Sequence, residues 1–106
     1  MEQGRSSVVC LAVDLQDGFH GDLVSVCVNG EQIYHRAGVT TSPLSGLADS
    51  FKTDLDSGPA TVEVAIETRE ISETVRLQVA ADMYIGVSIV HSELEYIVSA
   101  EPFGYA

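Results

Sequence analysis

The sequence predicts an all-β fold, an antiparallel two-sheet sandwich of about seven strands. Three observations predict it. Apolar and polar residues alternate with a period of two along most of the chain. Valine and isoleucine, which favour strands, predominate wherever apolar residues cluster. Turn-forming residues recur at the short intervals typical of sandwiches, and a length of 106 residues leaves room for one domain, residues 1–106.

The first two predicted strands are the alternating segments 8–14 and 24–28. If they form a hairpin centred on Gly18-Phe19, Cys10 falls opposite Cys27 on the outer face. Directly opposed β-carbons lie about 4.5–5.5 Å apart, which is slightly long for a disulfide. Two interpretations stay open: a strained, redox-labile cross-strand disulfide, or two reduced thiols that pack as small apolar groups.

The dipeptide Asn29-Gly30 predicts a tight hairpin, because both residues tolerate the positive φ of a type I′ turn. The third strand is expected over residues 32–39. This register sets Val26 opposite Ile33 and turns Tyr34 to the outer face.

One short helix is predicted near residues 43–51. Ser42 is a suitable N-cap, proline follows at the first helical position, and apolar residues come after it at helical spacing. Gly46 limits the helix to one or two turns. Residues 54–59 are expected to form a loop.

The second half predicts a meander of four strands in two antiparallel pairs. In the first pair, setting Ile66 opposite Val75 also matches the other apolar residues of the two strands. In the second pair, setting Ile89 opposite Leu94 does the same.

Two segments of the second half carry a family resemblance. Residues 58–64 (GPATVEV) and 96–105 (YIVSAEPFGY) resemble transthyretin-like, or prealbumin-like, sandwiches, whose second half runs through a strand, a return strand and an aromatic C-terminal segment. The hydrolytic branch of that family ends in a Tyr-Arg-Gly-Ser motif, whereas this chain ends Phe103-Gly104-Tyr105-Ala106. The resemblance therefore implies a binding or accessory module and no hydrolase. Immunoglobulin-like sandwiches fit the same strand pattern.

The formal net charge is −11, from sixteen acidic and five basic residues. Such a surface repels nucleic-acid phosphates and anionic membranes, so neither is expected as a partner. It suits a cation or a basic partner, and it also promotes solubility.

No segment is long enough to span a bilayer, and the N-terminus lacks a signal-peptide pattern. The protein is expected in the cytoplasm unless the chain is an excised extracellular module.

Two acidic segments are candidate binding sites. The first contains four polar side chains within nine positions: Asp14, Asp17, His20 and Asp22. Converging carboxylates suit Ca²⁺, for which Asp17 and Asp22 are candidates, but no known ligand spacing is matched. The second, with Asp54 and Asp56, begins like a calcium loop and lacks the distal glutamate. For each of the two segments, the alternative that it is a solvated loop without a bound ion stays open.

Catalytic and cofactor motifs are not recognisable in the sequence. The histidines His20, His35 and His91 lie on separate segments without metal-ligand spacing. His35 is in phase with Ile33 and is expected to face the interior. No nucleophile elbow or glycine-rich phosphate loop is present, so we expect neither an enzyme nor a cofactor.

The expected function is a non-catalytic binding or protein-interaction module for a protein or small ligand. A first alternative is a carbohydrate-binding or Ca²⁺-dependent extracellular module, in which the outward Tyr34 would stack on a sugar. A second is a small hydrolase on a transthyretin-like frame. A third is self-assembly into a homo-oligomer through an exposed edge strand.

Overall fold

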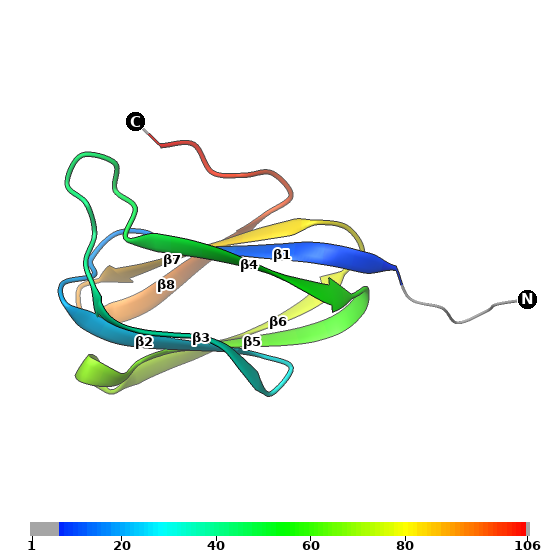
Figure 1. Cartoon of the computed structure of the whole chain (residues 1–106), viewed down its shortest axis with the longest axis horizontal. Coiled ribbons are helices and arrows are strands. Elements are labelled where there is room, and N and C mark those ends of the chain that lie inside the picture. Colours follow the sequence, from blue (N-terminus) through cyan, green and yellow to red (C-terminus); the bar gives the residue numbers. More distant parts are fainter. Residues whose placement is uncertain (1–6, 106) are drawn as a thin grey trace, which may run out of the picture.

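The chain folds into a sandwich of two four-stranded sheets, which confirms the predicted fold class (Figure 1). The computed structural model describes residues 7–105. Along the chain the elements are β1 (Val8–Leu15), β2 (Asp22–Val28), β3 (Glu31–Val39), β4 (Asp49–Asp56), β5 (Gly58–Ile66), the 3₁₀ turn η1 (Glu67–Arg69), β6 (Ile71–Val79), β7 (Met83–Val90) and β8 (Glu93–Ser99).

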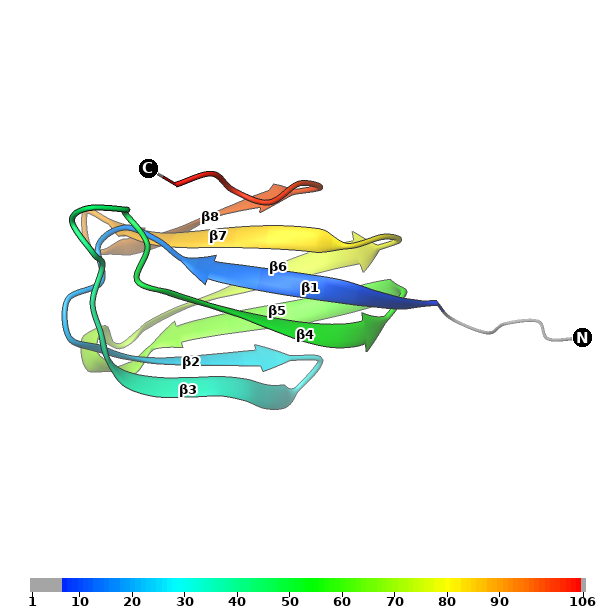
Figure 2. The same cartoon turned by 45° about the horizontal axis from the view of Figure 1, so that its top comes forward.

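The two sheets have the strand orders β4-β1-β7-β8 and β3-β2-β5-β6 (Figure 2). Three hairpins stay within one sheet: β2–β3, β5–β6 and β7–β8. The other connections cross between the sheets. β1 lies inside its sheet, antiparallel to β4 and parallel to β7. As a result β4, β8, β3 and β6 are the four edge strands.

The core lies between the inner faces of the sheets. Inward positions predicted from the alternation are buried there, because every second side chain of a strand points to the same face. Fully buried examples come from both sheets: Leu11, Val24, Val62, Ile66 and Ile85. Burial of each such side chain stabilises the fold by about 1.5–3 kcal/mol.

One predicted turn and one predicted register are confirmed. Asn29 and Gly30 adopt positive φ of 51° and 83°, and Val28 pairs with Glu31 across them. In the last hairpin Ile89 pairs with Leu94. His91 and Ser92 form the two-residue turn there, both with positive φ.

The predicted helix near residues 43–51 is wrong. Ser42 accepts a hydrogen bond from the N–H of Gly46 at 2.9 Å, which closes a single turn, and Gly46 then turns left-handed with φ of 78°. Asp49 begins β4, an eighth strand that also replaces the predicted loop at residues 54–56. Within residues 7–105, η1 is the only helical element, and no helix there is long and apolar enough to cross a membrane.

The predicted register of the second hairpin is wrong from Val26 onward. Val28 and Cys27 pair as expected, but Val26 pairs with Tyr34, so Ile33 is an extra residue in a β-bulge. The bulge turns Tyr34 inward against the core and leaves His35 exposed, which reverses both predicted orientations.

The predicted pairing of Ile66 with Val75 is also wrong. Ile66 pairs with Ile71, a shift of four residues. The reason is a compact turn: η1 occupies only three residues and Glu70 closes it in the left-handed conformation, with φ of 57°. Because the shift is even, the buried residues keep their face.

The predicted opposition of Cys10 and Cys27 is wrong, because the chain crosses to the other sheet between β1 and β2. Cys10 pairs with Asp54 of β4, while Cys27 lies between Gln32 and Glu63. Both cysteines are free thiols, and they occupy outward positions on opposite sheets.

Candidate functional site

Asp22, one of the predicted calcium ligands, is a buried structural carboxylate. It lies at the start of β2 with its side chain 3% exposed. Arg69 donates to both of its oxygens from Nε and Nη2, each at 3.0 Å, and Thr68 donates its hydroxyl at 2.6 Å. The backbone N–H of His20 adds a fourth bond at 2.8 Å. The carboxylate therefore ties the first crossing loop to η1.

The protonation equilibrium of Asp22 reflects this environment. Burial alone would raise its pKa. The hydrogen bonds from Arg69, Thr68 and the His20 backbone outweigh burial, so the pKa of Asp22 lies below its ordinary value of 3.8. The group is ionised near neutral pH, and its charge is neutralised by Arg69.

The other residues of this acidic segment point elsewhere. Asp14, on the outer face of β1, accepts a hydrogen bond from the Tyr105 hydroxyl at 2.6 Å. Asp17 and His20 are exposed in the crossing loop. Within residues 7–105, no three His, Cys, Asp or Glu side chains gather closely enough to hold a metal ion.

Tyr34, the predicted sugar-stacking residue, closes one side of the sandwich. Its ring stacks on Phe51 of β4, with centroids 4.4 Å apart and an interplanar angle of 14°. Its hydroxyl donates to Asp49 at 2.6 Å, and Arg36 donates to the same carboxylate at 2.9 Å. Burial and the neighbouring Asp49 raise the pKa of Tyr34. One face of the ring is covered, and the contacts join β3 to β4.

Asp54 and Asp56 lie on β4 and not in a loop. Both are exposed and alternate with the partly buried Leu55, so they point away from the core. They form an acidic pair on the outer face of this edge strand.

The most conspicuous exposed apolar surface lies on β8, which the sequence did not single out. Tyr96, Ile97 and Val98 are 44%, 61% and 39% exposed, three consecutive apolar residues on an edge strand. Such an edge also presents unpaired backbone groups, which makes it a template for another strand. A run of exposed apolar residues in the second strand of a terminal hairpin is the signal that could have identified it.

The hairpin geometry shows which backbone groups of β8 face solvent. The residues on either side of the two-residue turn His91-Ser92, Val90 and Glu93, form a backbone hydrogen-bonded pair. Beyond them, pairs of opposite residues that hydrogen-bond to each other alternate with pairs that do not. The backbone groups of alternate residues therefore point away from β7: Leu94, Tyr96 and Val98. We call the surface formed by residues 93–98 the β8 edge.

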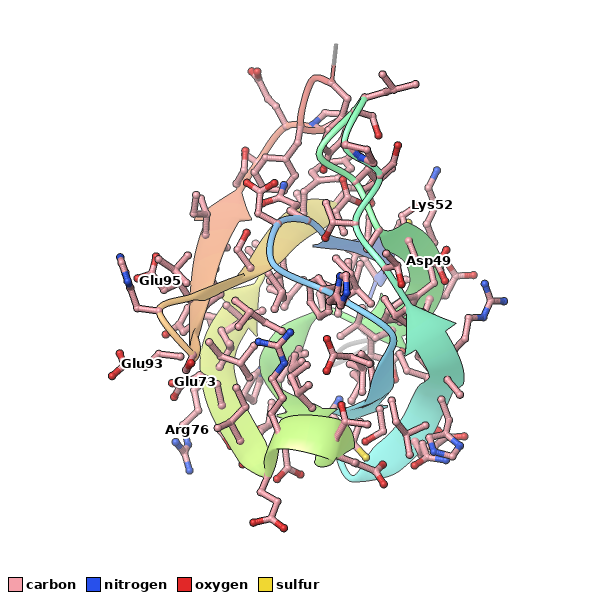
Figure 3. The ribbon with its side chains drawn as sticks, turned by 90° about the vertical axis from the view of Figure 1, so that its left-hand side faces the viewer. Asp49, Lys52, Glu73, Arg76, Glu93 and Glu95 are labelled. Carbon is pink, nitrogen blue, oxygen red and sulfur yellow. The ribbon has the colours of Figure 1, made fainter. Side chains whose placement is uncertain are left out.

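Acidic side chains flank the β8 edge. Glu93 and Glu95 lie on β8 itself and Glu73 lies on β6, and Figure 3 shows all three on the same side of the molecule. Arg76 of β6 lies on that side as well, whereas Asp49 and Lys52 lie on the other (Figure 3). The β8 edge is thus an apolar strip with acidic borders.

No protein-family model and no curated protein matches the chain.

Proposed function

We propose that this domain is a non-catalytic protein-interaction module that binds its partner through the β8 edge. The observation that carries the proposal is the run of exposed apolar residues, Tyr96 to Val98, on a strand that is paired on one side only. An extended segment added there would gain main-chain hydrogen bonds for affinity. Alternate side chains of that segment would supply specificity.

The opposite side of the sandwich has a different character. There Tyr34, Phe51 and Asp49 connect β3 to β4 across the two sheets. The aromatic and acidic side chains on that side therefore already bind one another within the chain. The β8 edge is consequently the better candidate for an intermolecular contact.

Selection from a phage-displayed library of random peptides, with the full chain as bait, tests this function. The Ile97→Lys variant serves for counter-selection, because a lysine on an edge strand opposes pairing without entering the core. We expect enriched peptides that bind the wild type and lose binding to the variant. A library without enrichment, or one whose peptides bind both proteins equally, contradicts the proposal.

We also propose that the sandwich is of the transthyretin-like type. Three features support this. Residues 58–64 lie in β5, β6 is the return strand, and the aromatic C-terminal segment places Tyr105 against Asp14 of β1. A binding or accessory role, which that resemblance implies, agrees with the function proposed above.

A further inference from the structure

We propose that the partner of the β8 edge is an extended, positively charged segment in which basic residues alternate with β-branched ones. This inference rests on the proposed function and adds the chemical class of the partner. Charged and apolar side chains divide between the two faces of β8.

The two faces of β8 differ in charge. Leu94 packs against the core, so residues 94, 96 and 98 form the inner row and residues 93, 95 and 97 the outer row. The inner row is entirely apolar. The outer row contains Glu93 and Glu95, both exposed, followed by Ile97. Acidic charge is therefore confined to one row of the strand, and it lies toward the strand's N-terminal half.

A strand that pairs with β8 continues this division. Its outward side chains lie opposite Glu93 and Glu95, where lysine or arginine forms cross-strand pairs and an acid is repelled. Its inward side chains extend the apolar row begun by Tyr96 and Val98, where valine, isoleucine or threonine packs best. Because both rows alternate with a period of two, the partner alternates in the same way.

The net charge of the chain favours the same partner. Glu73 of β6 lies on the same side as Glu93 and Glu95, and the base labelled there, Arg76, offsets one of these acidic charges (Figure 3). The whole chain carries a formal charge of −11, so a cationic segment is attracted from a distance. A second copy of this chain would instead bring two sets of Glu73, Glu93 and Glu95 to one interface, which opposes self-pairing.

The test uses three fluorescently labelled peptides of the same seven-residue length as β8. The first alternates lysine with valine. The second replaces each lysine by glutamine, and the third has the composition of the first with its lysines grouped at one end. We expect the alternating basic peptide to bind the full chain at least about tenfold more tightly than either control, since two cross-strand ion pairs together are worth about that factor.

Two double variants test where the peptide binds. Glu93→Gln with Glu95→Gln removes the outer-row charges and should weaken binding of the basic peptide about tenfold. Asp54→Asn with Asp56→Asn is the matched control, because it removes two exposed acids, also two positions apart, from the other edge strand of the same sheet. The affinity of this control variant for the basic peptide should stay within about twofold of the wild-type affinity.

Equal weakening by both double variants means that net charge alone attracts the peptide, and the basic-strand proposal fails. Equal binding of the glutamine and lysine peptides, lost in Ile97→Lys, leaves the interaction edge standing and rejects the basic partner. Dimerisation of the free chain through β8, detected by sedimentation, makes a second copy the occupant and also rejects it. Failure of all three peptides to bind, together with an unsuccessful library selection, rejects both proposals.

Discussion

Asp22 shows how a single buried carboxylate connects distant parts of this chain. It lies at the start of β2, directly after the first crossing loop, yet the side chains that hold it, Thr68 and Arg69, come from the turn after β5. A buried charge is tolerated only when it is paired and fully hydrogen-bonded. The sequence presents Asp22 among acids that could bind calcium, and nothing local reveals an arginine 47 positions away.

Replacement of Asp22 by alanine should lower the free energy of unfolding by about 3 kcal/mol, because Arg69 and Thr68 would lose their buried partner. Denaturant unfolding at neutral pH measures this. Asp17→Ala is the control, since its carboxylate is exposed in the crossing loop before β2 and its removal should cost less than about 0.5 kcal/mol. Similar losses in the two variants would contradict a structural role specific to Asp22.

The same residue predicts a pH dependence. Its pKa is lowered in the folded protein, so the contribution of Asp22 is complete above the ordinary value of 3.8 and is lost as the pH falls through the folded-state pKa. Between neutral pH and the acid range, the wild type should lose more stability than Asp22→Asn. Parallel loss of stability in the two proteins would count against the ion pair.

Gly18 marks a close approach of the crossing loop to β7. A β-carbon at this position would lie 2.0 Å from the carbonyl oxygen of Ile89, and φ is 90°. Gly21, in the same loop, also has positive φ but has no atom within 4 Å of its would-be β-carbon. Gly18→Ala should therefore destabilise the fold well beyond the roughly 1 kcal/mol expected of Gly21→Ala. Thermal melts of the two variants compare them directly, and equal shifts would contradict the close approach.

At the scale of elements, alternation predicted which faces are buried better than it predicted which residues pair. The inner rows of β1, β2, β5 and β7 follow from a period of two, and this holds even where the register is wrong. The pairing of Ile66 depended on the length of a turn that carries no strong sequence signal. The displacement of Ile33 depended on a bulge, which alternation alone cannot reveal.

β4 was missed for a physical reason. As an edge strand it needs only one covered face, and Phe51 and Leu55 are its only large apolar residues. Thr53 completes its inner row. The same apolar residues also fit a helical spacing with Leu44 and Leu47, so the local pattern supports two interpretations that only the tertiary structure distinguishes.

The link between β3 and β4 predicts an energetic coupling between Tyr34 and Phe51. Stacked rings in this geometry contribute about 1 kcal/mol beyond the area that they bury. A double-mutant cycle with Tyr34→Leu and Phe51→Leu, followed by denaturant unfolding, should give a coupling energy of that size. Additive effects within about 0.3 kcal/mol would mean that the stack does not join the sheets.

The C-terminal segment is held to β1 by Tyr105. Its hydroxyl donates to Asp14 and accepts a hydrogen bond from Gln16 at 2.9 Å. Tyr105→Phe should speed amide exchange in residues 100, 101, 103 and 104 and cost about 1 kcal/mol of stability. Tyr96→Phe, which removes the same atom from an exposed ring, is the control. Unchanged exchange in Tyr105→Phe would contradict this attachment.

An alkaline pH dependence accompanies this attachment. Burial and the bond to Asp14 raise the pKa of Tyr105 to about 12. The stabilisation is therefore complete below the ordinary value of 10.0 and is lost as the pH rises toward 12. Tyr105→Phe should lack this loss, and the difference between the two stability profiles measures it.

At the scale of the whole molecule, the two long sides of the sandwich are unequal. Tyr34, Phe51 and Asp49 close the side of β3 and β4, while β8 leaves three apolar residues exposed beside Glu73, Glu93 and Glu95 (Figure 3). From the sequence, self-assembly through an exposed edge strand is one of several alternatives. The sequence could not predict which edge strand is available, because edge identity follows from strand order and strand order from long-range contacts.

Residue-resolved amide hydrogen exchange of the free chain, at low protein concentration, tests the availability of the β8 edge most directly. We expect fast exchange at Leu94, Tyr96 and Val98, whose N–H groups face solvent, and slow exchange at Glu95 and Ile97, whose N–H groups face β7. Addition of the alternating basic peptide should slow the first three and leave the other two unchanged. Slow exchange at Leu94, Tyr96 and Val98 in the free chain would show that the edge is already covered and would contradict the account.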